Sequence, residues 1–395
     1  MKKLLTMLFL AAWALSASAN DGVFYAAGNQ LIPIVETDII VKKEVLSIVR
    51  QGDYAIIDVH YEFFNPTKAK TLLVGFEAPT PYNATFNFSD YHDSHPFISD
   101  FTVNLNGKDL PYKVALVEND SIYYKNGEFI YADTLEEKES IELSGSPFGQ
   151  YVYHFTATFR PGLNIIHHRY KYRLSSSVVS DAGLYYTLTA ANRWANRQID
   201  DFTLNIDMGK HTSFCMPLTF FENLSEWQFN GIGLCNKLPS NFEGSDYKHE
   251  YVSFHIQSGY ITFHKENFHP QGELTAEFYH YLWDFYEKDS LESMLDYIKT
   301  HYLTGNLDEK IPLLNDYLKI NKPEVYPDNI RKIMRNLPWA YRGYVFKDKK
   351  LQKFFESTQW YIANPAYKGS QEDFSSGDKK WVRYWDLDEN SEIIE

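Results

Sequence analysis

The sequence is poor in cysteine: its 395 residues include only two, Cys215 and Cys235. Two cysteines are too few for the multiple-bridge framework of a small secreted domain, and alone they cannot supply the four ligands of a structural zinc site. In an oxidising compartment the pair can close a loop of about 21 residues, which would stabilise the fold by roughly 3 kcal/mol. The alternative is two buried thiols.

Positive charge is also scarce. The chain has 38 lysine and arginine residues against 52 aspartate and glutamate residues, a formal net charge of −14. Nucleic acid is excluded as a partner, because binding to phosphates needs clustered bases. The deficit is uneven: residues 306–395 contain 15 basic and 15 acidic residues, so the net negative charge lies in the preceding part of the chain.

Motifs of catalysis and cofactor binding are missing from the sequence: it has no G-x-S-x-G, no P-loop, no G-x-G-x-x-G and no H-E-x-x-H. Two patterns come closer to a site. The strand-like HHRYKYR of His167–Arg173 alternates polar and half-buried positions, and one helical stripe carries the four residues Glu277, His280, Asp284 and Glu287. Solvated polar faces explain both patterns, so we predict no catalytic residue, no metal and no cofactor.

Only one long apolar run stands out, at the start of the chain. Lys2 and Lys3 precede the apolar stretch Leu4–Leu15, and small residues follow at 17–19. This is typical of a signal peptide over residues 1–19, and about 12 apolar residues are fewer than a membrane helix needs. An uncleaved anchor is the alternative; a lipid anchor is excluded, because no cysteine follows the run. We expect an extracytoplasmic protein, in the periplasm or on the cell surface, with no transmembrane anchor after cleavage.

Aromatic residues, in contrast, are abundant: 30 tyrosines and 28 phenylalanines, a composition that favours strands. Apolar and polar residues alternate through Ala55–Phe64. The NPT sequence at Asn65–Thr67 predicts a turn into a partner strand over Thr71–Glu77. Asn106-Gly107 and Asn126-Gly127 predict two-residue hairpins.

These patterns predict an α+β multidomain protein whose N-terminal region is an antiparallel β-sandwich. A first β-sandwich domain is expected over residues 20–148 and a second β-rich domain over 149–273. One large split sandwich fits the same pattern.

From about Leu274 the apolar period changes to 3.6 residues, and this predicts a helical connector over 274–325. A small helical module is expected over 326–385. Asp328 and Asp348 are candidate helix caps, and Pro338 should interrupt the helices. Trp381–Trp385 would add a final edge to this module. Residues 386–395 form an acidic tail that is expected to be disordered.

The module contains the stretch NLPWAYRGYVFKDKKLQKFFESTQWY. Together with the helix NIRKIMRNL before it, this stretch resembles the YARHG domain of bacterial cell-envelope proteins over Asp328–Tyr361. Ala340 and Gly343 keep the second and fifth letters of the motif, and the other three letters are replaced by Trp339, Tyr341 and Arg342. The resemblance implies an extracellular, envelope-associated accessory domain without an assigned activity. The N-terminal region resembles secreted bacterial β-rich modules in pattern only.

Basic residues gather in the same stretch. Eight of them lie between Arg331 and Lys353, with Asp348 as the single acid. Such a cluster attracts anionic polymers, and tyrosine and tryptophan rings suit sugars. The alternatives are that the rings form a core and that the bases form a solvated face or dock on the acidic body. The candidate binding residues are Trp339, Tyr341, Arg342, Tyr344, Lys347, Lys350, Trp360 and Tyr361.

The expected function is therefore that of a secreted or periplasmic, non-enzymatic cell-envelope protein. It would bind or scaffold, with the C-terminal module recognising an anionic envelope glycan or another envelope protein. The alternative is a secreted hydrolase of envelope glycan or peptide, with its active residues in the β-rich part.

Overall fold

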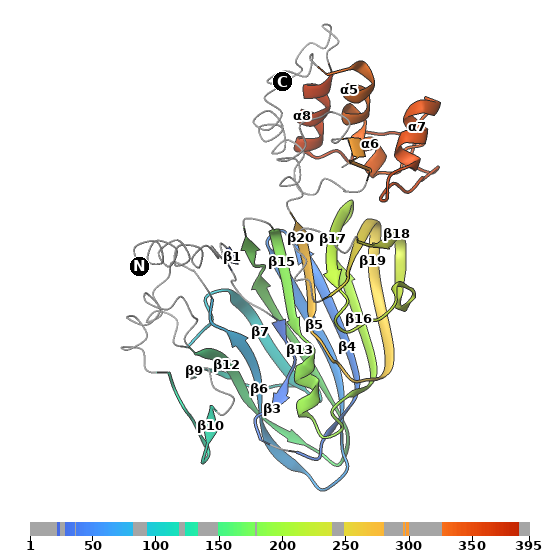
Figure 1. The fold of residues 1–395 in the computed structure, drawn as a ribbon. Helices are drawn as coiled ribbons and strands as arrows, with labels where there is room; N and C mark the ends of the chain where they lie inside the picture. The colour runs from blue at the N-terminus through green and yellow to red at the C-terminus, as the bar shows by residue number, and fades with distance from the viewer. Residues whose placement is uncertain are drawn as a thin grey trace, which may run out of the picture.

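The structure is a computed structural model of the chain. It describes residues 22–23, 28–35, 37–81, 93–117, 123–132, 149–177, 180–238, 249–279, 295–296, 298–299 and 326–386. These residues form a β-rich body and a small helical module at its end (Figure 1). The α+β class predicted from the sequence is thereby confirmed. The expected signal peptide and most of the acidic tail lie outside the described residues.

The β body comprises the described residues up to 279. Its strands are β1 (Gly22–Val23), β2 (Gly28–Asn29), β3 (Ile32–Pro33), β4 (Ile40–Gln51), β5 (Tyr54–Asn65), β6 (Lys70–Pro79), β7 (Ile98–Leu105), β8 (Lys108–Asp109), β9 (Lys113–Val117), β10 (Tyr124–Lys125), β11 (Glu128–Phe129), β12 (Gln150–Phe159), β13 (Gly162–Arg173), β14 (Ser176–Ser177), β15 (Ser180–Thr187), β16 (Ile199–Asp207), β17 (Thr212–Pro217), β18 (Trp227–Lys237), β19 (Tyr251–Phe268) and β20 (Leu274–Tyr279). Two 3-10 turns, η2 (Thr189–Arg193) and η3 (Leu224–Glu226), lie between β15 and β16 and between β17 and β18.

Two sheets share one core. The larger has 12 strands in the order β2-β15-β20-β17-β19-β16-β4-β5-β13-β7-β8, with β18 paired to β19; the smaller has the order β3-β6-β12-β9. Rings from both sheets meet between them: Phe63 of β5 lies 5.7 Å from Phe159 of β12 and 4.4 Å from Trp194, measured between ring centroids. This large contiguous apolar core is what holds the sandwich together.

The predicted boundary between residues 148 and 149 is not where the β body divides. Strand β13 pairs with β5 and β7, β12 pairs with β6 and β9, and β16 pairs in parallel with β4. Strands from both predicted domains thus alternate within both sheets. The two-domain division is replaced by the alternative arrangement, one large split sandwich with some parallel pairing.

Local patterns predicted several elements well. Ile57, Val59, Tyr61 and Phe63 are at most 1% exposed, as the alternation in β5 requires. In both Asn-Gly pairs the two residues have positive φ, and each pair closes a hairpin, β7–β8 and β10–β11. Asparagine and glycine tolerate this left-handed backbone better than other residues do.

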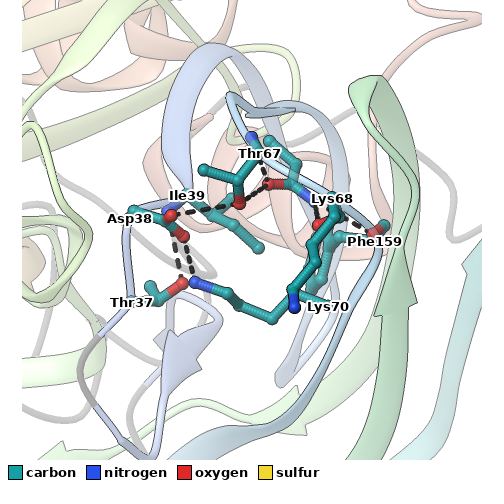
Figure 2. A network of polar contacts seen from close by, with 8 residues as sticks. Thr37, Asp38, Ile39, Thr67, Lys68, Lys70 and Phe159 are labelled. Carbon is teal, nitrogen blue, oxygen red and sulfur yellow. Dashed lines mark hydrogen bonds and ion pairs between the residues drawn. The ribbon is translucent and has the colours of Figure 1, made fainter.

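The turn after β5 is a corner between the sheets, which corrects the predicted hairpin. The strand expected over Thr71–Glu77 exists as β6, but it pairs with β12 of the smaller sheet. Figure 2 shows the network that holds this corner. The buried Asn65 amide donates to the carbonyls of Lys68 and Phe159, both at 3.0 Å, and its oxygen accepts from the Thr67 amide at 3.1 Å. Lys70 and Thr67 both contact the Asp38 carboxylate.

Replacing Asn65 by alanine is expected to lower the free energy of unfolding by about 2–4 kcal/mol, because it leaves buried backbone groups without partners. Urea unfolding measures the loss. Thr158→Ala, which removes a hydrogen bond of an exposed threonine to Thr71, is the matched control and should change stability by less than about 1 kcal/mol. A loss for Asn65→Ala as small as that of the control would contradict this role.

The prediction that the helical connector begins at Leu274 is wrong for its first six residues. Leu274–Tyr279 is strand β20, which pairs with β15 and touches β17, and pairing with two neighbours outweighs a local pattern. Residues 295, 296, 298 and 299 are helical, as the predicted connector over 274–325 requires. The rest of the predicted connector, with His280, Asp284 and Glu287, lies outside the described residues.

The candidate disulfide is not formed: Cys215 and Cys235 are both thiols. Cys215 of β17 lies opposite Ser253, and Cys235 of β18 lies opposite Phe254 on the other edge of β19. With β19 between them, the two backbones are about 9–10 Å apart, beyond the reach of a disulfide, which needs Cα atoms within about 7 Å. The adjacent positions 253 and 254 also point to opposite faces.

The C-terminal module consists of the helices α5 (Asp328–Arg335), α6 (Leu337–Tyr341), α7 (Lys349–Glu356) and α8 (Ser376–Trp385). Pro338 stands in the first turn of α6, after the break from α5. Asp348 caps α7, as predicted, by accepting from the amides of Lys350 and Leu351. The final edge expected at Trp381–Trp385 is instead part of helix α8. Among the described helices, none is long and apolar enough to cross a membrane.

Candidate functional site in the C-terminal module

The module has its own core. Its buried residues come from all four helices and from the helical turn near residue 298, and they include Ile298, Ile330, Met334, Leu337, Leu351, Phe355, Trp381 and Trp385. The Trp381 indole donates to the Met334 carbonyl at 2.6 Å. A separate core of this kind holds surface side chains in fixed places.

Two of the candidate binding residues belong to this core. Tyr341 and Trp360 are 4% and 3% exposed, with ring centroids 4.9 Å apart, and the Trp360 indole donates to the Ile298 carbonyl at 2.7 Å. These rings stabilise the module and do not reach its surface. The alternative that the aromatic residues form a core therefore holds for both.

Arg342 is also buried, at 6% exposed, which removes it from the candidate surface. Its guanidinium donates to the Pro338 carbonyl at 2.8 Å, to the Asp373 carbonyl at 2.6 Å and to the Asp378 carboxylate at 2.9 Å. It also lies over the Phe374 ring at 4.4 Å. Arg342 thus ties α6 to the start of α8.

Sequence reasoning missed Asp378, although a signal was present. Ser375 and Asp378 have the spacing of a capping box, and both reciprocal hydrogen bonds form at the start of α8. The same signal would have predicted a helix, not an edge, for the residues that follow. One carboxylate therefore serves both the helix cap and the buried arginine.

Three candidates remain at the half-buried level: Trp339, Tyr344 and Tyr361. The Tyr361 hydroxyl donates to the Tyr344 carbonyl at 2.8 Å, and the Trp339 indole donates to the Gly369 carbonyl at 3.2 Å. These bonds fix the rings while leaving part of each one open to solvent. Half-exposed rings of this kind offer apolar faces beside polar groups.

The bases of α5 are paired within the module. Arg331 contacts Asp328, Lys332 contacts Asp348, and Arg335 lies 2.8 Å from Asp386. The lysine and the two amides of α7 hold the pKa of Asp348 at about 2. Asp348 therefore stays ionised and already occupies the N-terminus of α7.

The remaining four bases form what we call the lysine cluster, which consists of Lys347, Lys349, Lys350 and Lys353. All four are exposed, and none has an ion-pair partner within the described part of the chain. Because Asp348 already caps α7, an incoming anion would meet ammonium groups rather than free helix amides. The candidates Lys347 and Lys350 belong to this cluster.

The HHRYKYR pattern forms no metal centre with the other described residues, and of the second pattern only Glu277 is described. His167 and His168 point to opposite faces of β13, as predicted, and Glu277 accepts from the Tyr185 hydroxyl at 2.6 Å. Across the described ranges, no three histidine, cysteine, aspartate or glutamate side chains gather as metal ligands would.

Comparisons with known proteins give one structural similarity over most of the chain and one domain match at its C-terminal end. Among solved structures, the chain is similar to a Legionella pneumophila protein named as a candidate nutrient binding protein. The two share 17% sequence identity and a TM-score of 0.46, over 93% of this chain and 100% of the other. No curated protein matches the chain. Residues 313–389 match the YARHG domain, so the C-terminal module is the part of this chain that is similar to that domain, which is typical of extracellular proteins.

Proposed function

We propose that this protein is a non-catalytic binding protein of the cell envelope, in which the β body carries a module that binds anionic envelope glycan through the lysine cluster. The observation that supports this most strongly is the exposure of four neighbouring lysines without acidic partners among the described residues. Exposed unpaired charges of one sign attract a polymer of the opposite sign.

The charge distribution supports the same proposal. Residues 326–386 contain 12 basic and 7 acidic residues, a net charge of +5, on a chain whose total is −14. The attraction is screened over about 8–10 Å at ordinary ionic strength, so only an anion close to the cluster is held. Lysine ammonium groups act as point charges that accept varied anion geometries, and Tyr344 and Tyr361 add ring surface for sugars.

Reversing two charges of the cluster tests the proposal. Lys347→Glu/Lys350→Glu is expected to lower the amount of full-length protein that sediments with purified peptidoglycan by tenfold or more, on the order of 1.4 kcal/mol. Raising the salt should release the wild-type protein in the same way, because screening weakens the attraction. Arg342 is not used, because its substitution would disturb folding.

Lys379→Glu/Arg383→Glu is the matched control, since it makes the same change in charge on exposed residues of α8. This control should sediment like the wild type. Equal sedimentation of the cluster variant and the wild type would remove the proposal. Retention on anionic lipid vesicles but not on peptidoglycan would replace the glycan with a lipid surface.

A further inference from the structure

The module is seated on one face of the β body. Three side chains of the β body reach main-chain carbonyls of the module. His211 Nδ1 donates to the Tyr341 carbonyl at 3.2 Å, Gln257 to that of Ile362 at 3.1 Å, and Asn236 to that of Gln359 at 2.9 Å. We call this the docking face; it lies on β18, β19 and the residue just before β17. In Figure 1 the module stands at the ends of these strands.

Gly343 shows that the motif itself lies at this contact. Its φ is +76°, and a Cβ there would lie 2.3 Å from the Ile362 carbonyl oxygen and 2.6 Å from the Gln257 amide nitrogen. The glycine is thus required twice, for a left-handed backbone and for the approach of a side chain from the β body. Since Tyr341 supplies the carbonyl for His211, the motif Trp339–Gly343 faces the docking face at two positions.

The docking face carries two histidines in contact with the module. His255 is 3% exposed; its Nδ1 lies 2.9 Å from the Ser213 hydroxyl, and its ring lies 6.3 Å from that of Trp360. His211 is partly buried beneath Tyr341. A charged imidazole in this place would lose its hydration and lie among groups of the module.

We propose that the motif Trp339–Gly343 is a docking element that seats the module on the docking face, and that protonation of His211 and His255 releases it. The neutral imidazole of His211 donates to a carbonyl, and the neutral ring of His255 packs under Trp360. Protonation adds two positive charges to a contact that already holds Arg342. Release would separate the lysine cluster from the acidic β body.

The surrounding charges agree with this direction. Burial and, to a smaller extent, the nearby His211 lower the pKa of His255 to about 3. For His211, burial and then Arg342 lower the pKa, while the Tyr341 carbonyl, Asp378 and Asp373 raise it and only partly offset this. Undocking returns the pKa of both imidazoles toward the ordinary value of 6.5. Docking is therefore fully favoured above pH 6.5 and is lost progressively as the pH falls toward 3.

The size of the effect follows from proton linkage. At pH 5, each histidine that returns to an ordinary pKa weakens docking by up to about 30-fold. Two histidines together would weaken docking by up to about 1,000-fold at that pH. Contacts of this kind between domains permit relative motion.

Small-angle X-ray scattering of the full-length protein tests the proposal. The maximum dimension should be small at pH 7.5 and larger at pH 5.0, with circular dichroism showing that both states remain folded. His211→Gln/His255→Gln should stay compact at both values. His60→Gln/His167→Gln, on the exposed outer face of β5 and β13, is the matched control and should open like the wild type. A wild type that stays compact at pH 5.0, or a docking-face variant that opens with it, overturns the proposal.

A second variant does not depend on the histidines. Gln257→Ala removes one contact from the β body and leaves the module sequence intact. Weaker docking requires fewer protons for release, so the midpoint of opening should move upward by about half a pH unit. An unchanged midpoint would show that this face does not hold the module.

Discussion

Arg342→Ala is expected to unfold the C-terminal module while leaving the β body folded. The substitution removes the guanidinium from the Asp378 carboxylate, from the buried Pro338 carbonyl and from the Asp373 carbonyl. Removing one partner of a buried ion pair costs about 3–5 kcal/mol, which is a large part of the stability of a module this small. Hydrogen exchange followed by mass spectrometry should show loss of protection in α5–α8 alone.

A lysine at position 342 distinguishes the effect of the positive charge from the effect of the guanidinium geometry. Arg342→Lys keeps the positive charge but cannot reach three acceptors and stack on Phe374 at once, so partial loss of protection is expected. Lys349→Ala, at an exposed position of α7, is the control and should behave as the wild type. Native protection of the module in Arg342→Ala would contradict the role of Arg342 as a structural tie.

The second large effect concerns Glu44 in the β body. A register shift between Val41 and Lys43 turns Glu44 inward on β4, as β-bulges do. The side chain is 1% exposed, and the Gln30 amide donates to both carboxylate oxygens, at 2.7 and 2.8 Å. Burial raises the pKa of Glu44 to about 8, and the hydrogen bonds from Gln30 offset this only in part.

The direction of the pH dependence follows from this shift. The folded protein holds the Glu44 proton more tightly than the unfolded chain, whose carboxyl has an ordinary pKa of 4.5. This contribution to stability is complete below pH 4.5, falls between pH 4.5 and 8, and is lost above pH 8. The slope reaches about 1.4 kcal/mol per pH unit.

Glu44→Gln should remove this slope and raise the free energy of unfolding at pH 8 by roughly 3–5 kcal/mol, because no carboxylate is then buried. The substituted amide can pair reciprocally with that of Gln30. Urea unfolding at pH 7 and pH 8 measures the free energy of unfolding of both proteins. Burial lowers the pKa of His95 and of His168 from 6.5 to about 4. Both pH values therefore lie above the range in which these two histidines titrate. Glu62→Gln, on the outer face of β5, is the control, and equal slopes for Glu44→Gln and wild type would refute the assignment.

Features that depend on neighbouring residues could be predicted from the sequence. The alternation of β5, the two Asn-Gly hairpins and the Asp348 cap each rest on contacts within a few positions. The break at Pro338 and the positive φ of Gly343 follow from the chemistry of single residues. These features place β5, the two hairpin turns and the start of α7 correctly.

Features that depend on distant partners could not be predicted. The sequence predicts a strand over Thr71–Glu77, but the partner β12 lies about 80 residues further along the chain, as Thr71 pairs with Thr158. Leu274–Tyr279 is a strand because it pairs with β15. The pairing of β4 with β16 joins the two predicted β domains into one. No local period carries this information.

The candidate site was predicted by residue type but not by exposure. Arg342 and Lys350 stand in the same basic stretch, yet one is tied to Asp378, 36 positions later, and the other faces solvent. Trp360 is buried because residue 298 packs against it. Exposure depends on which segments fold over a residue, and the sequence pattern gives this only in part.

Lysine labelling tests the central claim most directly. The full-length protein is treated briefly with an acetylating reagent, with and without peptidoglycan, and each lysine is quantified by mass spectrometry. We predict that Lys347, Lys349, Lys350 and Lys353 react fast when the protein is alone and become protected when the glycan is present, whereas Lys379 of α8 reacts equally in both. Slow labelling of the cluster in the free protein, or no protection by the glycan, would contradict the account.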